Sequence, residues 1–287
     1  MKKALSGLAL TALALALAAT ASGRPTAPAA LPGCAPSTLH LLKAGTLTLA
    51  TDNPAFPPWW GGSEKSPFKI SNPYSGKGYE SAVAYAIAKR LGFARSAVTW
   101  TPVPFLRSYA PGKKPFDFYL AQVSYKPIRA KAVTFSSSYY EVNQAVVGIK
   151  GKPIAKVKTV AGLKPYKFGV PLGTTSYDYV VRYIKPSQQP KVYDTLNDAV
   201  TALKNGQIDG LVVDYPSTGY ITGVQVPNGV VVGRLPTRGG QEHFGLVFQK
   251  GNPLVTCVNK AIASLTKDGT LKKLEKQWLA GDAPVLK

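Results

Sequence analysis

Residues 116–131, FDFYLAQVSYKPIRAK, decide the fold. The apolar and aromatic run from Phe116 to Val123 predicts a buried strand. The run gives way to a polar turn at Ser124, and Pro127 is typical of the first turn of a short helix that carries Arg129. A hydroxyl at a strand end and a guanidinium five residues later together offer donors for a carboxylate. The alternative is that Arg129, one of 35 basic residues, lies in solvent.

The N-terminus has the pattern of an export signal. Two lysines follow Met1, an Ala/Leu-rich run extends to Ala19, and Ala19-Thr20-Ala21 is an A-x-A cleavage pattern. This predicts a signal peptide over residues 1–21. No later stretch reaches about 18 apolar residues, the length that spans a bilayer. We therefore expect secretion across the inner membrane, into the periplasm or onto the cell surface.

Residues 22–38 are rich in Pro, Ala and Gly, which predicts a flexible leader. Cys34 and Cys257 are the two cysteines of the chain. In an oxidising compartment, such a pair favours one disulfide that ties the N-terminal segment to a C-terminal helix. The alternative is lipid modification of Cys34, because residues 31–34 loosely resemble a lipobox. The distance of this site from the apolar run favours the disulfide.

The chain is strongly basic, with a formal net charge of +21. Such a surface favours anionic neighbours. The lysines are scattered and no nucleic-acid-binding motif accompanies them, so no nucleic-acid partner is expected. The two histidines, His40 and His243, form no ligand pattern with the cysteines, so neither a metal nor a cofactor is expected.

Strand and helix signals alternate along the chain and predict an α/β fold. Residues 46–51 and 208–213 have strand patterns, and residues 83–91 and 196–203 have amphipathic helix patterns. Extended segments at 141–150 and 244–248 are typical of a chain that crosses to a second lobe and returns. We expect lobe 1 to comprise residues 39–147 and 245–287, and lobe 2 to comprise 148–244.

Polar residues at strand ends mark the predicted site. Thr174 and Thr175 stand in a turn that opens a helix, where hydroxyl and N–H groups either bind an anion or only cap the helix. Asp214 follows the strand at 208–213 and is either a site residue or a turn residue before Pro216. Ligands of α/β folds bind at the carboxyl ends of strands, so Arg129 and Asp214 are predicted to face one crevice from opposite lobes.

In combination, several segments resemble bacterial extracellular solute-binding proteins of the amino-acid class (family 3), the receptors of ABC importers. The segments are TDNPAFPPW, GKGYESAVAYAIAKRLGF, FDFYLAQVSYKPIRAKAVTFSSSYYEVNQAVVG, GVPLGTTSYDY and LKNGQIDGLVVDYP. The resemblance extends from about Leu47 to Leu279. It implies a periplasmic-binding-protein (venus-flytrap) fold with two hinge-crossing strands, which closes on a free amino acid and delivers it to a membrane permease. A monomer is expected.

The resemblance also implies residue roles. Arg129 matches the arginine that pairs with the ligand α-carboxylate, and Asp214 matches the aspartate that accepts the α-ammonium. Phe56 matches an aromatic residue beside the ligand side chain. Gln122 stands where the family often has a small residue, which leaves the ligand side chain open. The expected ligand-binding residues are Asp52, Phe56, Trp59, Glu80, Phe105, Gln122, Val123, Ser124, Arg129, Pro171, Thr174, Thr175 and Asp214.

An exported dehydratase-like enzyme on the same fold is the alternative function. Glu80 or Asp52 would then act as a general acid, provided that burial raises its pKa. The chain has no nucleophile elbow and no partnered histidine, so we expect binding and not catalysis.

Overall fold

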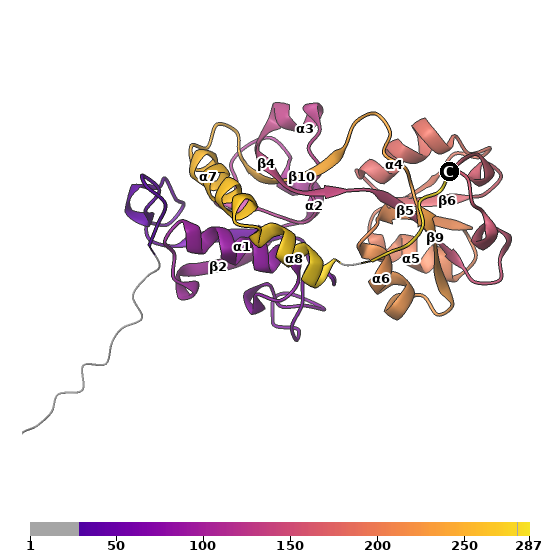
Figure 1. Cartoon of the computed structure of the whole chain (residues 1–287), viewed down its shortest axis with the longest axis horizontal. Coiled ribbons are helices and arrows are strands. Elements are labelled where there is room, and N and C mark those ends of the chain that lie inside the picture. The colour runs from indigo at the N-terminus through magenta and orange to yellow at the C-terminus, as the bar shows by residue number, and fades with distance from the viewer. Residues whose placement is uncertain (1–28, 280) are drawn as a thin grey trace, which may run out of the picture.

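The computed structural model describes residues 29–279 and 281–287, and the predicted signal peptide at 1–21 lies outside this part of the chain. The described residues form two lobes, each built on a five-stranded sheet (Figure 1). The strand order is β2-β1-β3-β10-β4 in the first lobe and β7-β6-β8-β5-β9 in the second. The strands are β1 (Leu47–Thr51), β2 (Val98–Pro102), β3 (Phe118–Tyr119), β4 (Val133–Val142), β5 (Gln144–Ile149), β6 (Phe168–Pro171), β7 (Lys191–Tyr193), β8 (Gly210–Asp214), β9 (Gly229–Arg234) and β10 (Glu242–Gln249). The predicted α/β two-lobe fold is confirmed.

Helices cover the sheets. They are α1 (Tyr79–Arg90), α2 (Phe105–Ser108), α3 (Pro127–Ala132), α4 (Thr175–Tyr179), α5 (Leu196–Lys204), α6 (Ser217–Tyr220), α7 (Leu254–Lys267) and α8 (Thr270–Trp278). In the first lobe, buried side chains of α1, α7 and α8 join one face of the sheet in a single apolar cluster, and a second cluster lies around β3. In the second lobe there are two apolar clusters. Different side chains of β5 and β8 belong to each of them, and one of the clusters also includes side chains of α5. Each lobe therefore has its own apolar core.

Two strand connections cross between the lobes, as the extended segments predicted. Strand β4 leads through Asn143 into β5 of the second sheet, and residues 235–241 return the chain from β9 to β10. The backbone thus changes lobes at Asn143 and at 235–241, a few residues before each predicted boundary.

The C-terminal segment makes a third crossing. It runs from α8 to the second lobe, where the chain ends (Figure 1). The N–H of Arg234 donates to the carbonyl of Pro284, and the N–H of Leu286 donates back to Arg234. Leu286 is buried in the second-lobe core. We expected this segment in the first lobe. Residues 281–287 instead pack on the second lobe, because the side chain of Leu286 is buried in the apolar core there.

The predicted strand at 116–123 is much shorter in the structure. Strand β3 comprises Phe118 and Tyr119, which pair with β1 and β10. Beyond it, Gln122 has a left-handed backbone conformation with φ of +54°, which ends the extended run. Ser124 then forms a bridge with Phe244 of β10. This local break ends the extended run before the chain enters α3, which carries Arg129.

The aromatic loop at residues 52–60 is fixed by the start of α1. The N–H groups of Tyr79 and Glu80 donate to the carbonyls of Pro58 and Trp59, so the helix end has its partners in the loop. Gly78 precedes the helix with φ of +87°, and a Cβ there would lie 2.5 Å from backbone atoms of Trp60. Glycine is required at this position for both reasons, and it lets the loop lie directly on the helix.

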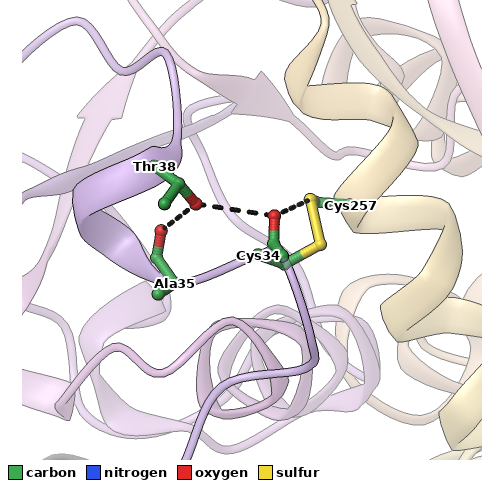
Figure 2. The surroundings of a disulfide bond; sticks show 5 residues. Cys34, Ala35, Thr38 and Cys257 are labelled. Carbon is green, nitrogen blue, oxygen red and sulfur yellow. Dashed lines mark hydrogen bonds between the residues drawn. A yellow bond between two sulfur atoms is a disulfide. The ribbon is translucent and has the colours of Figure 1, made fainter.

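The predicted disulfide joins Cys34 to Cys257 of α7 (Figure 2). The two Cα atoms are 5.6 Å apart and both cysteines are buried. In the predicted leader, residues 29–38 lie against the first lobe, where the N–H of Leu31 donates to the carbonyl of Arg90. Pairing in the disulfide excludes lipid modification of Cys34 in this state.

None of the described helices combines the length and the apolar character needed to cross a bilayer.

Candidate ligand-binding site

A cavity of about 420 Å³ lies between the two lobes. This volume is in the range of small-molecule sites, roughly 300–1,000 Å³. Residues from both lobes line it, at the ends of β1, β3, β6 and β8 where the chain leaves each sheet. The predicted residues that line it are Asp52, Phe56, Phe105, Gln122, Ser124, Arg129, Pro171, Thr174, Thr175 and Asp214. The carboxyl ends of the strands therefore assemble one site from both sheets.

Three predicted residues, Trp59, Glu80 and Val123, do not line this cavity. Trp59 and the adjacent Trp60 are both buried in the first-lobe core, and of the two only Trp60 also contributes to the cavity lining. Val123 is fully buried beside β10. Glu80 is also fully buried, and its carboxylate accepts hydrogen bonds from the hydroxyl of Tyr139 and from the N–H and side-chain amide of Gln122. Its place is behind the cavity wall.

Glu80 stabilises the turn at Gln122, which is part of the cavity wall. Its carboxylate accepts the backbone N–H of Gln122 at 2.7 Å, which supports the left-handed conformation of that residue. Burial raises the pKa of Glu80 to about 7, and the hydrogen bonds from Tyr139 and Gln122 oppose this rise. Glu80 thus positions Gln122, whose side chain forms part of the cavity wall.

Arg129 is buried at the meeting point of the lobes, with 6% of its surface exposed. Its Nη1 donates to the carbonyl of Ser124 at 2.6 Å, and its Nη2 donates across the lobes to the carbonyl of Gly173 at 2.7 Å. The guanidinium lies over the ring of Tyr109, 4.5 Å from its centroid. Burial lowers the pKa of Arg129, but an arginine side chain stays charged in proteins. Two of its five N–H donors are thus used by carbonyls.

Asp214 lies at the end of β8, on the second-lobe side of the cavity. Its Oδ1 accepts the side-chain amide of Gln144 at 2.7 Å. Burial raises the pKa of Asp214 well above its usual value, and the nearby charge of Glu242 raises it further. Among the described residues, the ion pairs are Arg90–Asp268 and Lys126–Asp178, so Asp214 and Arg129 are not paired with each other. Both residues line the cavity between the lobes.

Sequence reasoning missed Glu242, the first residue of β10. Its Oε1 accepts the hydroxyls of Ser124 and Thr175, each at 2.6 Å, and its Oε2 accepts the amide of Gln144 at 3.1 Å. It also missed Gln144, which is buried and contacts both Glu242 and Asp214. Each residue is the first one after a segment that crosses between the lobes. That position in the sequence could have marked both as candidate site residues.

The two lobes are in direct contact around the cavity. The indole N–H of Trp59 donates to the hydroxyl of Ser217 at 2.9 Å, across the lobes. Lys126 of the first lobe forms an ion pair with Asp178 of the second. Phe56 packs against Tyr220, with ring centroids 6.0 Å apart. The structure therefore shows a closed arrangement of the lobes.

Two α/β lobes joined by crossing strands, with a cavity between them that charged residues of both lobes line, define the class of the molecule: it is a two-lobe solute-binding protein. The sequence pattern of the bacterial extracellular solute-binding proteins, family 3, matches residues 61–281. The chain belongs to this family.

Known proteins of similar sequence and structure agree with this assignment. The ABC transporter arginine-binding protein 1 of Escherichia coli (strain K12) is 28% identical over 212 residues, which cover 70% of this chain and 81% of that protein. The structure of an ancestral arginine-binding protein bound to arginine is 32% identical, with a TM-score of 0.65, and the match covers 82% of this chain and 99% of that one. The structure of AncCDT-1, an ancestral amino-acid-binding protein and precursor of cyclohexadienyl dehydratase, is 26% identical with a TM-score of 0.65. The match covers 82% of this chain and 96% of that one.

Proposed function

We propose that the protein is an exported receptor of an ABC importer that captures one free amino acid between its lobes and delivers it, as a monomer, to a membrane permease. The ligand α-carboxylate binds at Arg129 and its α-ammonium at Asp214. The observation that carries the proposal is the cavity between the lobes, which is lined by the Arg129 guanidinium from one lobe and by Asp214, which has no ion-pair partner among the described residues, from the other. The signal-like N-terminus and the names of the relatives support export and delivery.

The opposite charges of Arg129 and Asp214 favour binding of a zwitterion. Charge-assisted hydrogen bonds contribute roughly 1.5–3 kcal/mol each. Several such bonds, after the costs of ordering and desolvation, are consistent with micromolar binding, about −8 kcal/mol. Because the two charges come from different lobes, a bound zwitterion contacts both only in the closed form. The ligand thereby stabilises closure.

The charge balance of the cavity restricts the ligand side chain. Three aspartates, Asp52, Asp194 and Asp214, line the cavity, and Arg129 is the cationic side chain among its lining residues. An acidic ligand side chain would add a further negative charge at short range. We expect a cationic or neutral polar amino acid and exclude aspartate and glutamate. The arginine named for one relative and found bound in one structural neighbour is consistent with this choice.

The dehydratase-like alternative has little support in the geometry. Glu80 is fully buried behind the wall, and its carboxylate oxygens are bonded to Tyr139 and Gln122. Asp52 does line the cavity, and burial raises its pKa. Of the other aspartates in the cavity lining, Asp214 is assigned to the ligand ammonium, and no histidine is among the described lining residues to serve as a general base. Binding without turnover is therefore the proposed function.

The test is a thermal-shift screen of free amino acids followed by recovery of the ligand. A ligand at a hundred times its dissociation constant adds about 2.7 kcal/mol to the free energy of unfolding. We expect one small group of cationic or polar amino acids to stabilise the protein and to be recovered unchanged by mass spectrometry. Absence of stabilisation by every amino acid contradicts the receptor function, and consumption of the ligand supports the enzyme.

A further inference from the structure

Glu242 is hydrogen-bonded to two residues that line the cavity, Ser124 and Thr175. The hydroxyls of Ser124 and Thr175 belong to different lobes and lie 3.5 Å apart. Both donate to one oxygen of Glu242, at 2.6 Å each. Under the proposed function, a ligand carboxylate beside Arg129 would lie within reach of the same two hydroxyls, because Ser124, Arg129 and Thr175 line one cavity and Arg129 donates to the carbonyl of Ser124.

The hydroxyl donors are fully used in this arrangement. Each hydroxyl carries a single proton, so Ser124 and Thr175 have none left for a second acceptor while they donate to Glu242. The third donor to the Glu242 carboxylate is the amide of Gln144, which is itself buried. Glu242 thus makes the contacts of a ligand carboxylate, although it is covalently part of the hinge strand β10.

We propose that Glu242 is a tethered competitor for the ligand carboxylate and thereby a specificity-determining residue of the site. It accepts both hydroxyls of the Ser124 and Thr175 pair in the closed arrangement of the lobes. An amino acid displaces it to bind. This inference rests on the proposed function and names the residue that sets the strength of amino-acid binding.

The same residue has the opposite effect on a ligand without a carboxylate. The amide nitrogen of Gln144 lies 2.7 Å from Asp214 and 3.1 Å from Glu242, so the two carboxylates stand side by side. A bare amine leaves Glu242 in place and gains the attraction of both charges. Glu242 therefore weakens binding of amino acids and strengthens binding of the corresponding decarboxylated amines.

Calorimetry with matched ligand pairs tests this proposal. The probes are L-arginine with agmatine, and L-histidine with histamine, in which each amine is the amino acid without its carboxylate. The variants are Glu242→Gln, which removes the charge, and Glu242→Asp, which keeps the charge but withdraws it from the hydroxyls by one methylene. The control is Glu141→Gln, the same change at an exposed residue of the neighbouring strand β4.

We expect both Glu242 variants to bind the amino acid about tenfold more tightly than wild type. Glu242→Gln should in addition bind the amine several-fold more weakly, and Glu141→Gln should change neither. Two variants keep the test valid if one of them folds poorly, which its melting temperature reports.

Other results overturn the proposal. Unchanged or weaker amino-acid binding in the variants means that Glu242 is not displaced. Tighter binding in Glu242→Gln alone means that its charge matters and its occupancy of the hydroxyls does not. If wild type binds none of the twenty amino acids in the screen, the proposed function itself fails, and this inference fails with it.

Discussion

The disulfide between Cys34 and Cys257 should contribute a large part of the stability of the first lobe. The bond closes a loop over a sequence separation of 223 residues. The chain-entropy relation for a loop of this size gives about 5 kcal/mol at 25 °C, and measured values for native disulfides are about 2–5 kcal/mol. For a chain of this size, that loss lowers the melting temperature by about 4–20 °C. Reduction should also release residues 29–38 from α7 and from the carbonyl of Arg90.

The assay is thermal unfolding with and without a reductant, with mass spectrometry to confirm that the bond is open. The Cys34→Ala/Cys257→Ala double variant is the control, because a reductant should not change its melting temperature. If the reduced wild type unfolds within 1 °C of the oxidised protein, the reasoning from loop closure is refuted for this chain.

Three further predictions concern the site and its support. Ligand affinity should fall by up to about tenfold per pH unit as the pH drops below the raised pKa of Asp214, because binding of the ligand ammonium needs the ionised carboxylate. Asp214→Asn should bind more weakly, with an affinity that depends less on pH, and an equal pH dependence of wild type and variant in calorimetry would speak against this. Ser217→Ala should weaken ligand binding about fivefold, because it removes an interlobe hydrogen bond from Trp59 that stabilises the closed form by about 1 kcal/mol. Unchanged affinity in calorimetry would show that this bond does not stabilise the closed form. Gly78→Ala should lower the free energy of unfolding by more than about 2 kcal/mol in urea titration, because its Cβ meets the backbone of Trp60. Gly112→Ala, with positive φ but nothing within 4 Å, is the control and should lose about 1 kcal/mol; equal losses would contradict a steric cause.

The sequence predicted features that depend on local pattern or on chain order. Apolar periodicity identified α1, and the extended segments at 141–150 and 244–248 predicted that the chain crosses to a second lobe and returns, although the observed return at 235–241 precedes the second segment. The disulfide followed from the count of cysteines and the export signal. These features need no knowledge of how distant segments pack.

The features that sequence reasoning missed depend on tertiary contact. Trp59 and Trp60 are adjacent, chemically identical and both buried in the first-lobe core, and only their tertiary contacts make Trp60 part of the cavity lining while the Trp59 indole bonds to Ser217. Glu242 contacts Ser124 and Thr175, which are 118 and 67 residues away in the chain. No local pattern records such contacts. The place of Leu286 in the second-lobe core is likewise set by space left between distant elements.

The account depends on the opposed charges of Arg129 and Asp214, and calorimetry on variants of both tests it most directly. Arg129→Ala and Asp214→Asn should each weaken binding of the stabilising amino acid by about 10- to 150-fold, the range given by one charge-assisted contact. Arg107→Ala, at an exposed arginine outside the cavity, should bind as wild type does. If Arg129→Ala or Asp214→Asn binds within about twofold of wild type, a zwitterion is not held between these two residues.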